Sequence, residues 1–329
     1  MSDFPDVQLH IVTGKGGTGK STIAASLALA LASRGKTVLL CEVEGRQCIA
    51  QMFDVPPLPY EERLVARATE HGHSNVYALA IDAEAALLEY LAMYYRLGRA
   101  GKALDRFGVI DFATTIAPGV RDVLLTGKVY EAAQRNSRNK NARRYDAIVL
   151  DAPPTGRIAQ FLNVNNELAG LAKVGPIKSQ ADTVTTLLRS PRTAVHLATV
   201  LEEMPVQETV DAVAELRAAN LPVGGVIVNL VRPQDLGEEA RATLLAGTVD
   251  QTALAKALTA AGIDASPVLV QSLVAEGRDH AERRRLEDSQ RALVEQIGIP
   301  TYELAKLAGG VDLGGLYELA ESLCEQGLA

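Results

Sequence analysis

The stretch Gly14–Ser21, GKGGTGKS, combines glycines, two lysines and a hydroxyl in the spacing G-x-x-x-x-G-K-[ST]. Glycines let successive backbone N–H groups converge on a phosphate without obstruction by a Cβ atom. A helix that follows such a loop adds the partial positive charge of its N-terminus. The spacing therefore predicts a nucleotide phosphate site formed by Gly14, Gly16, Gly17, Thr18, Gly19, Lys20, Ser21 and Thr22.

Three side chains supply the expected chemistry of this site. Lys20 would place a full positive charge on the β- and γ-phosphates, and the Ser21 hydroxyl would bind Mg²⁺. The apolar run RYDAIVLD ends in Asp151, whose carboxylate would then lie near the magnesium, directly or through water. Asp151 could instead only cap the turn that follows its strand. Its pairing with the loop favours the metal role, so Ser21 and Asp151 are the candidate metal ligands.

The elements around the loop have the order that a phosphate site requires. An apolar strand at 7–13, a helix at 21–35 and a strand at 36–44 form a βαβ unit, which argues against a chance match of the loop motif. Further strands are expected at 74–82, 145–151, 193–201, 221–229 and 297–304. Strands alternating with helices predict an α/β fold with a doubly wound, mainly parallel sheet. We expect a single domain over 1–329, with helical insertions at about 83–134 and 163–190 forming a subdomain beside the sheet.

Composition excludes several other classes of protein. The chain has 329 residues, a net charge of −7 and three cysteines, which favours a protein of a reducing compartment without a disulfide framework. The N-terminus has no signal-peptide pattern, and no run approaches the roughly 18 apolar residues of a membrane span. The basic tract 135–144 lacks interleaved aromatics, so a solvated connection is favoured over a nucleic-acid site. The expected location is cytoplasmic, with no stable membrane insertion and no nucleic-acid partner.

Lys15, inside the loop, makes the sequence resemble one particular group of nucleotide-binding ATPases. A lysine at this place is typical of the deviant Walker A ATPases, which include partition, cell-division and nitrogenase iron proteins. The segment DAPPTGRIAQFL (151–162) is similar to the second switch of one branch, the arsenical-pump and tail-anchored-protein-targeting (guided-entry) ATPases. The block 204–229 also resembles this branch, and places Asn229 where the family contacts adenine. The resemblance, to a bacterial single-domain form, extends from about Val7 to the C-terminus.

The resemblance implies a dimer that encloses ATP or ADP with Mg²⁺ between its subunits. Lys15 of one subunit would then reach the phosphates held by the other, in a role similar to that of an arginine finger, which contributes about 10³–10⁵ in rate. The alternative is a solvated loop lysine, which is disfavoured because a cation so close to bound phosphate would interact with it. The partner subunit is either a second copy or a paralogue.

The sequence departs from the family at both switches. The run Glu44-Gly45-Arg46-Gln47 replaces a first switch of the type D-P-A-H, so Glu44 would orient the attacking water on a longer arm. A misplacement of about 1 Å can cost about 100-fold in rate, which predicts slow or differently gated hydrolysis. Arg157 stands at the usual histidine of the second switch, and would contact either phosphate or a nearby acid.

Three ligand sites of the relatives are not expected here. Cys41, Cys48 and Cys324 are scattered, so they offer no metalloid or iron–sulfur site, and the chain has no C-x-x-C motif for an interfacial zinc. Cys41 lies in an apolar strand and is expected in the core. His71 and His73 are expected in a surface loop. A groove for transmembrane clients would be rich in Met, and the insertions contain only Met93.

Three functions compete at this stage. The favoured one is a Mg²⁺-dependent ATPase, in which nucleotide-driven dimer closure changes how the helical subdomain binds a protein or hydrophobic client. The second is a weakly or non-hydrolysing nucleotide-binding scaffold, half of a heterodimer with a paralogue. The third, a membrane- or DNA-positioning ATPase, is disfavoured because the C-terminal helix is acidic and is expected to pack on its own core. Its apolar stripe consists of Leu313, Leu316, Leu319 and Leu323.

Overall fold

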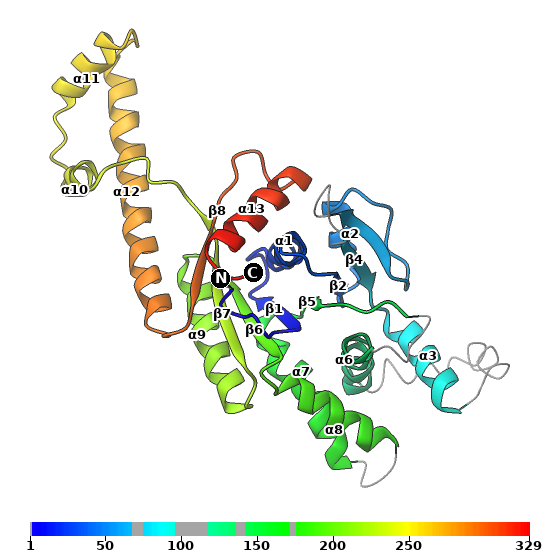
Figure 1. Cartoon of the computed structure of the whole chain (residues 1–329). Coiled ribbons are helices and arrows are strands. Elements are labelled where there is room, and N and C mark those ends of the chain that lie inside the picture. Colours follow the sequence, from blue (N-terminus) through cyan, green and yellow to red (C-terminus); the bar gives the residue numbers. More distant parts are fainter. Residues whose placement is uncertain (1, 68–74, 96–117, 136–141, 172–175) are drawn as a thin grey trace.

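An eight-stranded sheet forms the centre of the protein (Figure 1). The computed structural model describes residues 2–67, 75–95, 118–135, 142–171 and 176–329. The strand order is β3-β4-β2-β5-β1-β6-β7-β8, and neighbours are parallel except β3 and β4. The strands are β1 (Leu9–Gly14), β2 (Val38–Glu42), β3 (Arg63–Arg67), β4 (Asn75–Ala80), β5 (Ala147–Asp151), β6 (Thr193–Thr199), β7 (Val223–Val231) and β8 (Thr301–Ala305). The expected doubly wound, mainly parallel α/β fold is confirmed; only β3 was not predicted.

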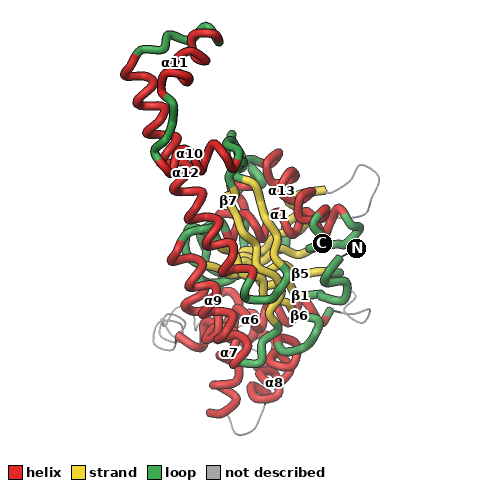
Figure 2. Tube along the Cα trace, turned by 90° about the vertical axis from the view of Figure 1, so that its left-hand side faces the viewer, coloured by secondary structure: helices red, strands yellow, loops and turns green. Residues whose placement is uncertain are grey.

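Helices cover both faces of the sheet, as the turned view also shows (Figure 2). Each face has its own apolar core of buried side chains. One core contains α1 (Lys20–Ser33), α2 (Cys48–Met52) and α13 (Leu313–Glu325). The other contains α6 (Pro118–Gln134), α7 (Thr155–Leu171), α8 (Pro176–Leu188) and α9 (Glu203–Ala218).

The helix that follows the glycine-rich loop is apolar nearly all round because both of its sides are covered. One side of α1 packs on the sheet and another packs against α13. From α13, Leu316, Leu319 and Leu323 are buried, while Leu313 remains 39% exposed. The expectation that the acidic C-terminal helix packs on the protein's own core is therefore confirmed for three of its four leucines.

The helices of the two expected insertions lie next to one another. Helix α3 (Ala83–Tyr95) contacts α6, which contacts α7 and α8 (Figure 1). Residues 96–117 and 172–175 of these tracts, and the histidines at 71 and 73, lie outside the described residues. A separate helical subdomain stays a prediction. None of the described helices combines the length and apolar content that crossing a membrane requires.

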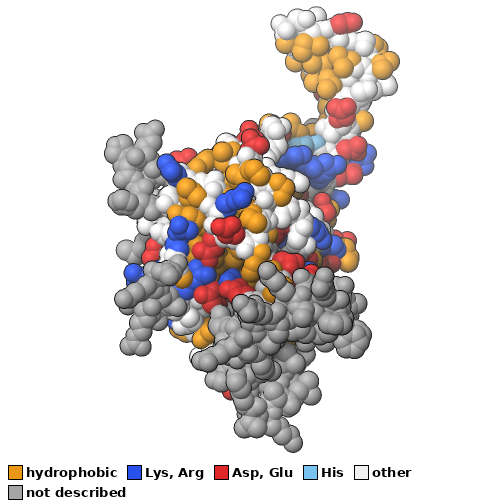
Figure 3. All heavy atoms as spheres, turned by 90° about the vertical axis from the view of Figure 1, so that its right-hand side faces the viewer, with side chains coloured by type: hydrophobic (Ala, Val, Ile, Leu, Met, Phe, Trp, Pro, Cys, Tyr) orange, Lys and Arg blue, Asp and Glu red, His pale blue; other side chains and the backbone are white. Residues whose placement is uncertain are grey.

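A helical arm between β7 and β8 projects from the body of the protein (Figures 1 and 2). It consists of α10 (Glu238–Ala246), α11 (Gln251–Ala260) and α12 (Pro267–Glu295). Helices α10 and α11 bury none of their residues and pack along α12. Figure 3 shows apolar side chains on the tip of the arm and charged ones nearer the body. This arm was not predicted from the sequence.

Candidate nucleotide site

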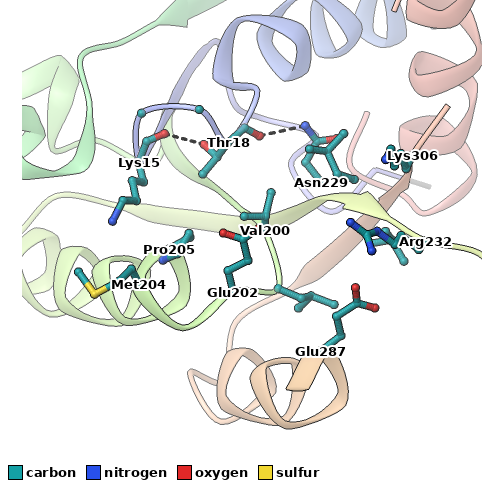
Figure 4. Close-up of a pocket in the computed structure, with 15 residues that line it drawn as sticks. Lys15, Thr18, Val200, Glu202, Met204, Pro205, Asn229, Arg232, Glu287 and Lys306 are labelled. Atoms are coloured by element: carbon teal, nitrogen blue, oxygen red, sulfur yellow. Dashed lines mark hydrogen bonds between the residues drawn. The ribbon is translucent and has the colours of Figure 1, made fainter. Parts of the chain in front are cut away.

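The glycine-rich loop follows the carboxyl end of β1 and is closed by its own hydrogen bonds. The backbone N–H and the Oγ1 hydroxyl of Thr18 both donate to the Lys15 carbonyl oxygen, at 3.3 and 2.9 Å. From β7, the Asn229 side-chain amide donates to the Thr18 carbonyl oxygen at 2.9 Å (Figure 4). Asn229 therefore braces the loop, and it also lines the neighbouring cavity.

Two of the loop glycines are required by their close neighbours. A Cβ atom on Gly14 would lie 2.2 Å from the carbonyl oxygen of Ala198 on β6. A Cβ atom on Gly19 would lie 2.3 Å from the Asn229 amide nitrogen, and Gly19 has a left-handed φ of +85°. These positions thus permit only glycine because of the packing around the loop.

Lys20, Ser21 and Asp151 meet where α1 begins. Lys20 is the first residue of α1 and is buried, and the Ser21 hydroxyl donates to Asp151 Oδ2 at 2.6 Å. Burial raises the pKa of Asp151 to about 6, and the nearby carboxylates of Glu42 and Glu44 add to this increase. The Ser21 hydrogen bond and the Lys20 charge act in the opposite direction. The site is therefore rich in negative charge, and a bound cation would stabilise it.

The chemistry of this pair fits magnesium. Hydroxyl and carboxylate oxygens are ligands that Mg²⁺ accepts, and the ion usually retains water and nucleotide phosphate as its other ligands. Within the described part of the chain, no group of three or more His, Cys, Asp or Glu side chains is arranged to hold a metal. Ser21 and Asp151 are thus suited to an ion that arrives with a nucleotide.

Lys15 has an acidic partner in the same chain. Its Nζ lies 2.7 Å from Oε1 of Glu208, on α9, and the two side chains are 31% and 35% exposed. The other oxygen of this carboxylate, Oε2, accepts a hydrogen bond from the Thr155 hydroxyl at 3.2 Å. Thr155 is the first residue of α7, so Glu208 joins the loop to the predicted second switch, residues 151–162.

The altered first switch forms a fixed turn. Gly45 and Gln47 both have left-handed backbones, with φ of 67° and 56°. The Gln47 side chain donates to the Leu58 carbonyl and accepts from the Leu58 N–H, at 3.1 and 2.7 Å. Glu44 forms an ion pair with Arg46 at 3.5 Å and has a side chain that is 25% exposed. Gln47, at the histidine position of the family, therefore anchors the turn.

Arg157 lies beside an acid. Its guanidinium is 3.7 Å from Oδ1 of Asp122, on α6, and its side chain is 58% exposed. Burial raises the pKa of Asp122, and the Arg157 charge partly opposes that increase. Of the two interpretations left open by the sequence, pairing with an acid describes this structure, and a phosphate contact stays a prediction.

A cavity of about 460 Å³ extends from the loop toward β7 and the root of the arm (Figure 4). Its volume lies within the range typical of small-molecule sites, about 300–1,000 Å³. Loop residues 15–18 form one wall and Asn229 another; Arg232, Lys306 and Glu287 supply charges on the far side. Glu287 belongs to α12 and pairs with the buried Arg284 at 2.6 Å, so the root of the arm forms part of the cavity wall.

Three acidic residues of this region were not predicted from the sequence: Glu42, Glu208 and Glu287. Glu42 had a detectable signal, since it is a charged residue in an otherwise apolar strand. Glu208 and Glu287 had none, because acidic residues are common on surface helices. Cys41 is buried, as predicted, and burial raises the pKa of its thiol to about 12. It is therefore an unreactive core residue.

A mainly parallel sheet with a glycine-rich loop between β1 and α1 defines a P-loop nucleotide-binding protein. Residues 7–185 match the anion-transporting ATPase family. The chain is 53% identical to the ATPase BagA of Mycobacterium tuberculosis over 329 residues, which cover 99% of this chain and 95% of that protein. The chain therefore belongs to the anion-transporting ATPase family.

More distant relatives carry the names that the sequence resemblance suggested. An arsenical pump-driving ATPase of Halobacterium salinarum is 27% identical over 69% of this chain and 36% of its own length. The ATPase get3 of Aspergillus niger is 31% identical over 51% of this chain and 46% of its own length. The expected membership of the arsenical-pump and guided-entry family is confirmed, and ATP or ADP is the nucleotide that such proteins bind.

Proposed function

We propose that this protein is a Mg²⁺-dependent ATPase that hydrolyses ATP to ADP and phosphate, and that nucleotide binding closes a dimer. The observation that carries the proposal is the contact between Ser21 and Asp151, at 2.6 Å beside the buried Lys20. This contact supports a cation site next to the glycine-rich loop. The cavity bounded by Asn229 offers room for the nucleoside.

Each residue has a distinct task in this reaction. The loop N–H groups and Lys20 would bind and orient the phosphates, and Glu44 would orient the attacking water. Ser21 and Asp151 would hold Mg²⁺, which when bound neutralises charge on the phosphate oxygens. Lys15 would leave Glu208 and neutralise charge in the site of the partner subunit, whether a second copy or a paralogue. Helices α3, α6, α7 and α8 would form the surface that binds a protein or hydrophobic client.

Steady-state ATP hydrolysis with Mg²⁺ tests the proposal. Lys20→Ala is expected to abolish turnover, and Lys15→Ala to lower it by about 10³-fold or more. Lys256→Ala is the matched control, because Lys256 is an exposed lysine on α11 of the arm. Unchanged rates in both loop variants would refute the proposal.

A second candidate is a nucleotide-binding scaffold that hydrolyses ATP weakly or not at all without a paralogous subunit. The altered first switch favours this candidate, since Glu44 forms an ion pair with Arg46 and the Gln47 side chain forms hydrogen bonds with Leu58. It predicts tight ATP binding and negligible turnover by the purified chain. Robust turnover of the chain alone would exclude it.

A further inference from the structure

Glu42 is a buried carboxylate beside the proposed cation site. It ends β2 and is 2% exposed, and its Cα pairs with that of Asp151 on the neighbouring strand β5. Side chains alternate along a strand, and Leu40 and Val149 of these strands pack in the same core as α1. Glu42 and Asp151 therefore both point toward the side of the sheet from which α1 presents Ser21.

The two oxygens of Glu42 have different surroundings. Oε1 accepts a hydrogen bond from the backbone N–H of Cys48 at 3.2 Å. Cys48 is the first residue of α2, directly after the altered switch that carries Glu44. Oε2 is buried and has no hydrogen-bond partner among the described residues. A buried carboxylate oxygen without a partner is costly, and functional sites are where such groups persist.

We propose that Glu42 is a third protein group of the magnesium site. Oε2 accepts a hydrogen bond from water bound to the ion, while Oε1 holds the Cys48 N–H. The same carboxylate thus links the ion to the turn that contains Glu44, and so positions that residue. This assignment rests on the proposed nucleotide function, and it adds a group that the loop motif does not include.

The test is a titration of the full chain with Mn²⁺ in the presence of ADP, in which free Mn²⁺ is measured by electron paramagnetic resonance. Glu42→Gln retains an oxygen that can accept from Cys48, but it removes the charge. We expect Mn²⁺ affinity to fall by about tenfold or more, as for other groups that orient a metal's ligands. ADP affinity without metal should remain at the wild-type value.

Thermal unfolding of the metal-free protein is a second measurement, in which the variant should gain stability, whereas it loses affinity in the Mn²⁺ titration. Glu42→Gln is expected to raise the unfolding midpoint, because it replaces an unpaired buried carboxylate by a neutral amide. A residue that only caps α2 would produce neither the loss of Mn²⁺ affinity nor the gain in stability. Glu238→Gln is the matched control, because Glu238 is an exposed glutamate on α10 of the arm, and it should leave Mn²⁺ affinity at the wild-type value.

The outcomes distinguish a failure of the proposed nucleotide function from a failure of the role assigned to Glu42. If the wild-type chain binds no ADP, the proposed function fails and the role of Glu42 fails with it. If the wild type binds Mn²⁺ with ADP and Glu42→Gln binds it equally tightly, only the role of Glu42 is overturned. Glu42→Asp covers the case in which the amide variant does not fold. Its shorter arm cannot serve both contacts, so wild-type Mn²⁺ affinity in Glu42→Asp would also overturn the assignment.

Discussion

Two buried histidines beneath the loop make the stability of this protein sensitive to acid. His10 on β1 and His196 on β6 are fully buried, with His10 Nδ1 and His196 Nε2 3.1 Å apart. His196 Nδ1 accepts from the Gly225 N–H at 3.2 Å. A neutral imidazole has one donor and one acceptor, so His196 must donate through Nε2 to His10. Both rings are thereby fixed as neutral Nε2–H tautomers.

The magnitude follows from the difference in proton binding between the folded and unfolded states. Burial lowers the pKa of His196 to about 4, and it lowers that of His10 well below its usual value, with His196 and Lys36 adding to the second shift. Both groups bind protons more readily in the unfolded chain, so stability is lost as the pH falls below about 6.5. Between pH 7 and pH 5, His196 alone accounts for about 2 kcal/mol. His10 acts in the same direction.

Asp151 acts in the opposite direction and must be separated from the histidines. Its pKa of about 6 lies above the unfolded value, so its protonation stabilises the metal-free folded protein as the pH falls below about 6. A comparison of the wild type with the double variant His10→Leu/His196→Leu removes this contribution, because Asp151 is present in both proteins.

Urea unfolding at pH 7 and pH 5, followed by far-ultraviolet circular dichroism, measures the effect. The double variant should be less stable at pH 7 by about 1–3 kcal/mol, since it leaves the Gly225 N–H without an acceptor. Between pH 7 and pH 5, the double variant should lose less of its free energy of unfolding than the wild type does, by about 2 kcal/mol or more. Equal losses in the two proteins would refute the reasoning. So would ¹⁵N spectra that show protonated His196 in the folded wild type at pH 5.

Three further predictions concern the loop and the core. Gly19→Ala should cost about 1–2 kcal/mol from its left-handed backbone and weaken ADP binding measured by calorimetry, since the new Cβ would displace Asn229. Glu208→Gln should change the free energy of unfolding by less than about 1 kcal/mol, because its ion pair with Lys15 is partly exposed. Sedimentation with a non-hydrolysable ATP analogue should nevertheless show the Glu208→Gln dimer at lower protein concentration. Leu323→Ala, in the fully buried contact between α13 and α1, should cost about 2–5 kcal/mol in urea unfolding.

The parts of the site that lie at strand ends could be predicted from the sequence. Ser21 follows a phosphate-loop pattern and Asp151 ends an apolar strand, and in a parallel sheet such carboxyl ends meet at one edge. The contact between these residues, at 2.6 Å, follows from that logic. Local patterns thus suffice wherever the backbone hydrogen bonds of the sheet determine which residues become neighbours.

The arm could not be predicted by the same means. Helix α12 buries Val270, Ala281 and Val294 together with the polar residues Arg284, Glu287 and Gln290, so its buried side chains do not form a purely apolar stripe. The spacing of these buried residues does not indicate that α10 and α11 pack on the far end of α12 instead of on the sheet. Glu287 reaches the cavity only because the root of this helix packs beside α9.

The contact between Lys15 and Glu208 limits how much Lys15 can contribute to the affinity of the proposed dimer. These residues are separated by most of the chain, so no local pattern indicates that they meet. Because Glu208 also binds Thr155, the ammonium of Lys15 is already placed beside a carboxylate in a single subunit. If the Lys15 ammonium moved to a phosphate held by a partner subunit, it would lose its partly exposed ion pair with Glu208 and gain a contact with that phosphate. Exposed pairs contribute about 0–1 kcal/mol, so the exchange adds little unless the partner's site is closed to water. In the proposed dimer, Lys15 would thus favour a closed nucleotide-bound state over a loose encounter, because only closure would lower the local dielectric enough to strengthen its contact.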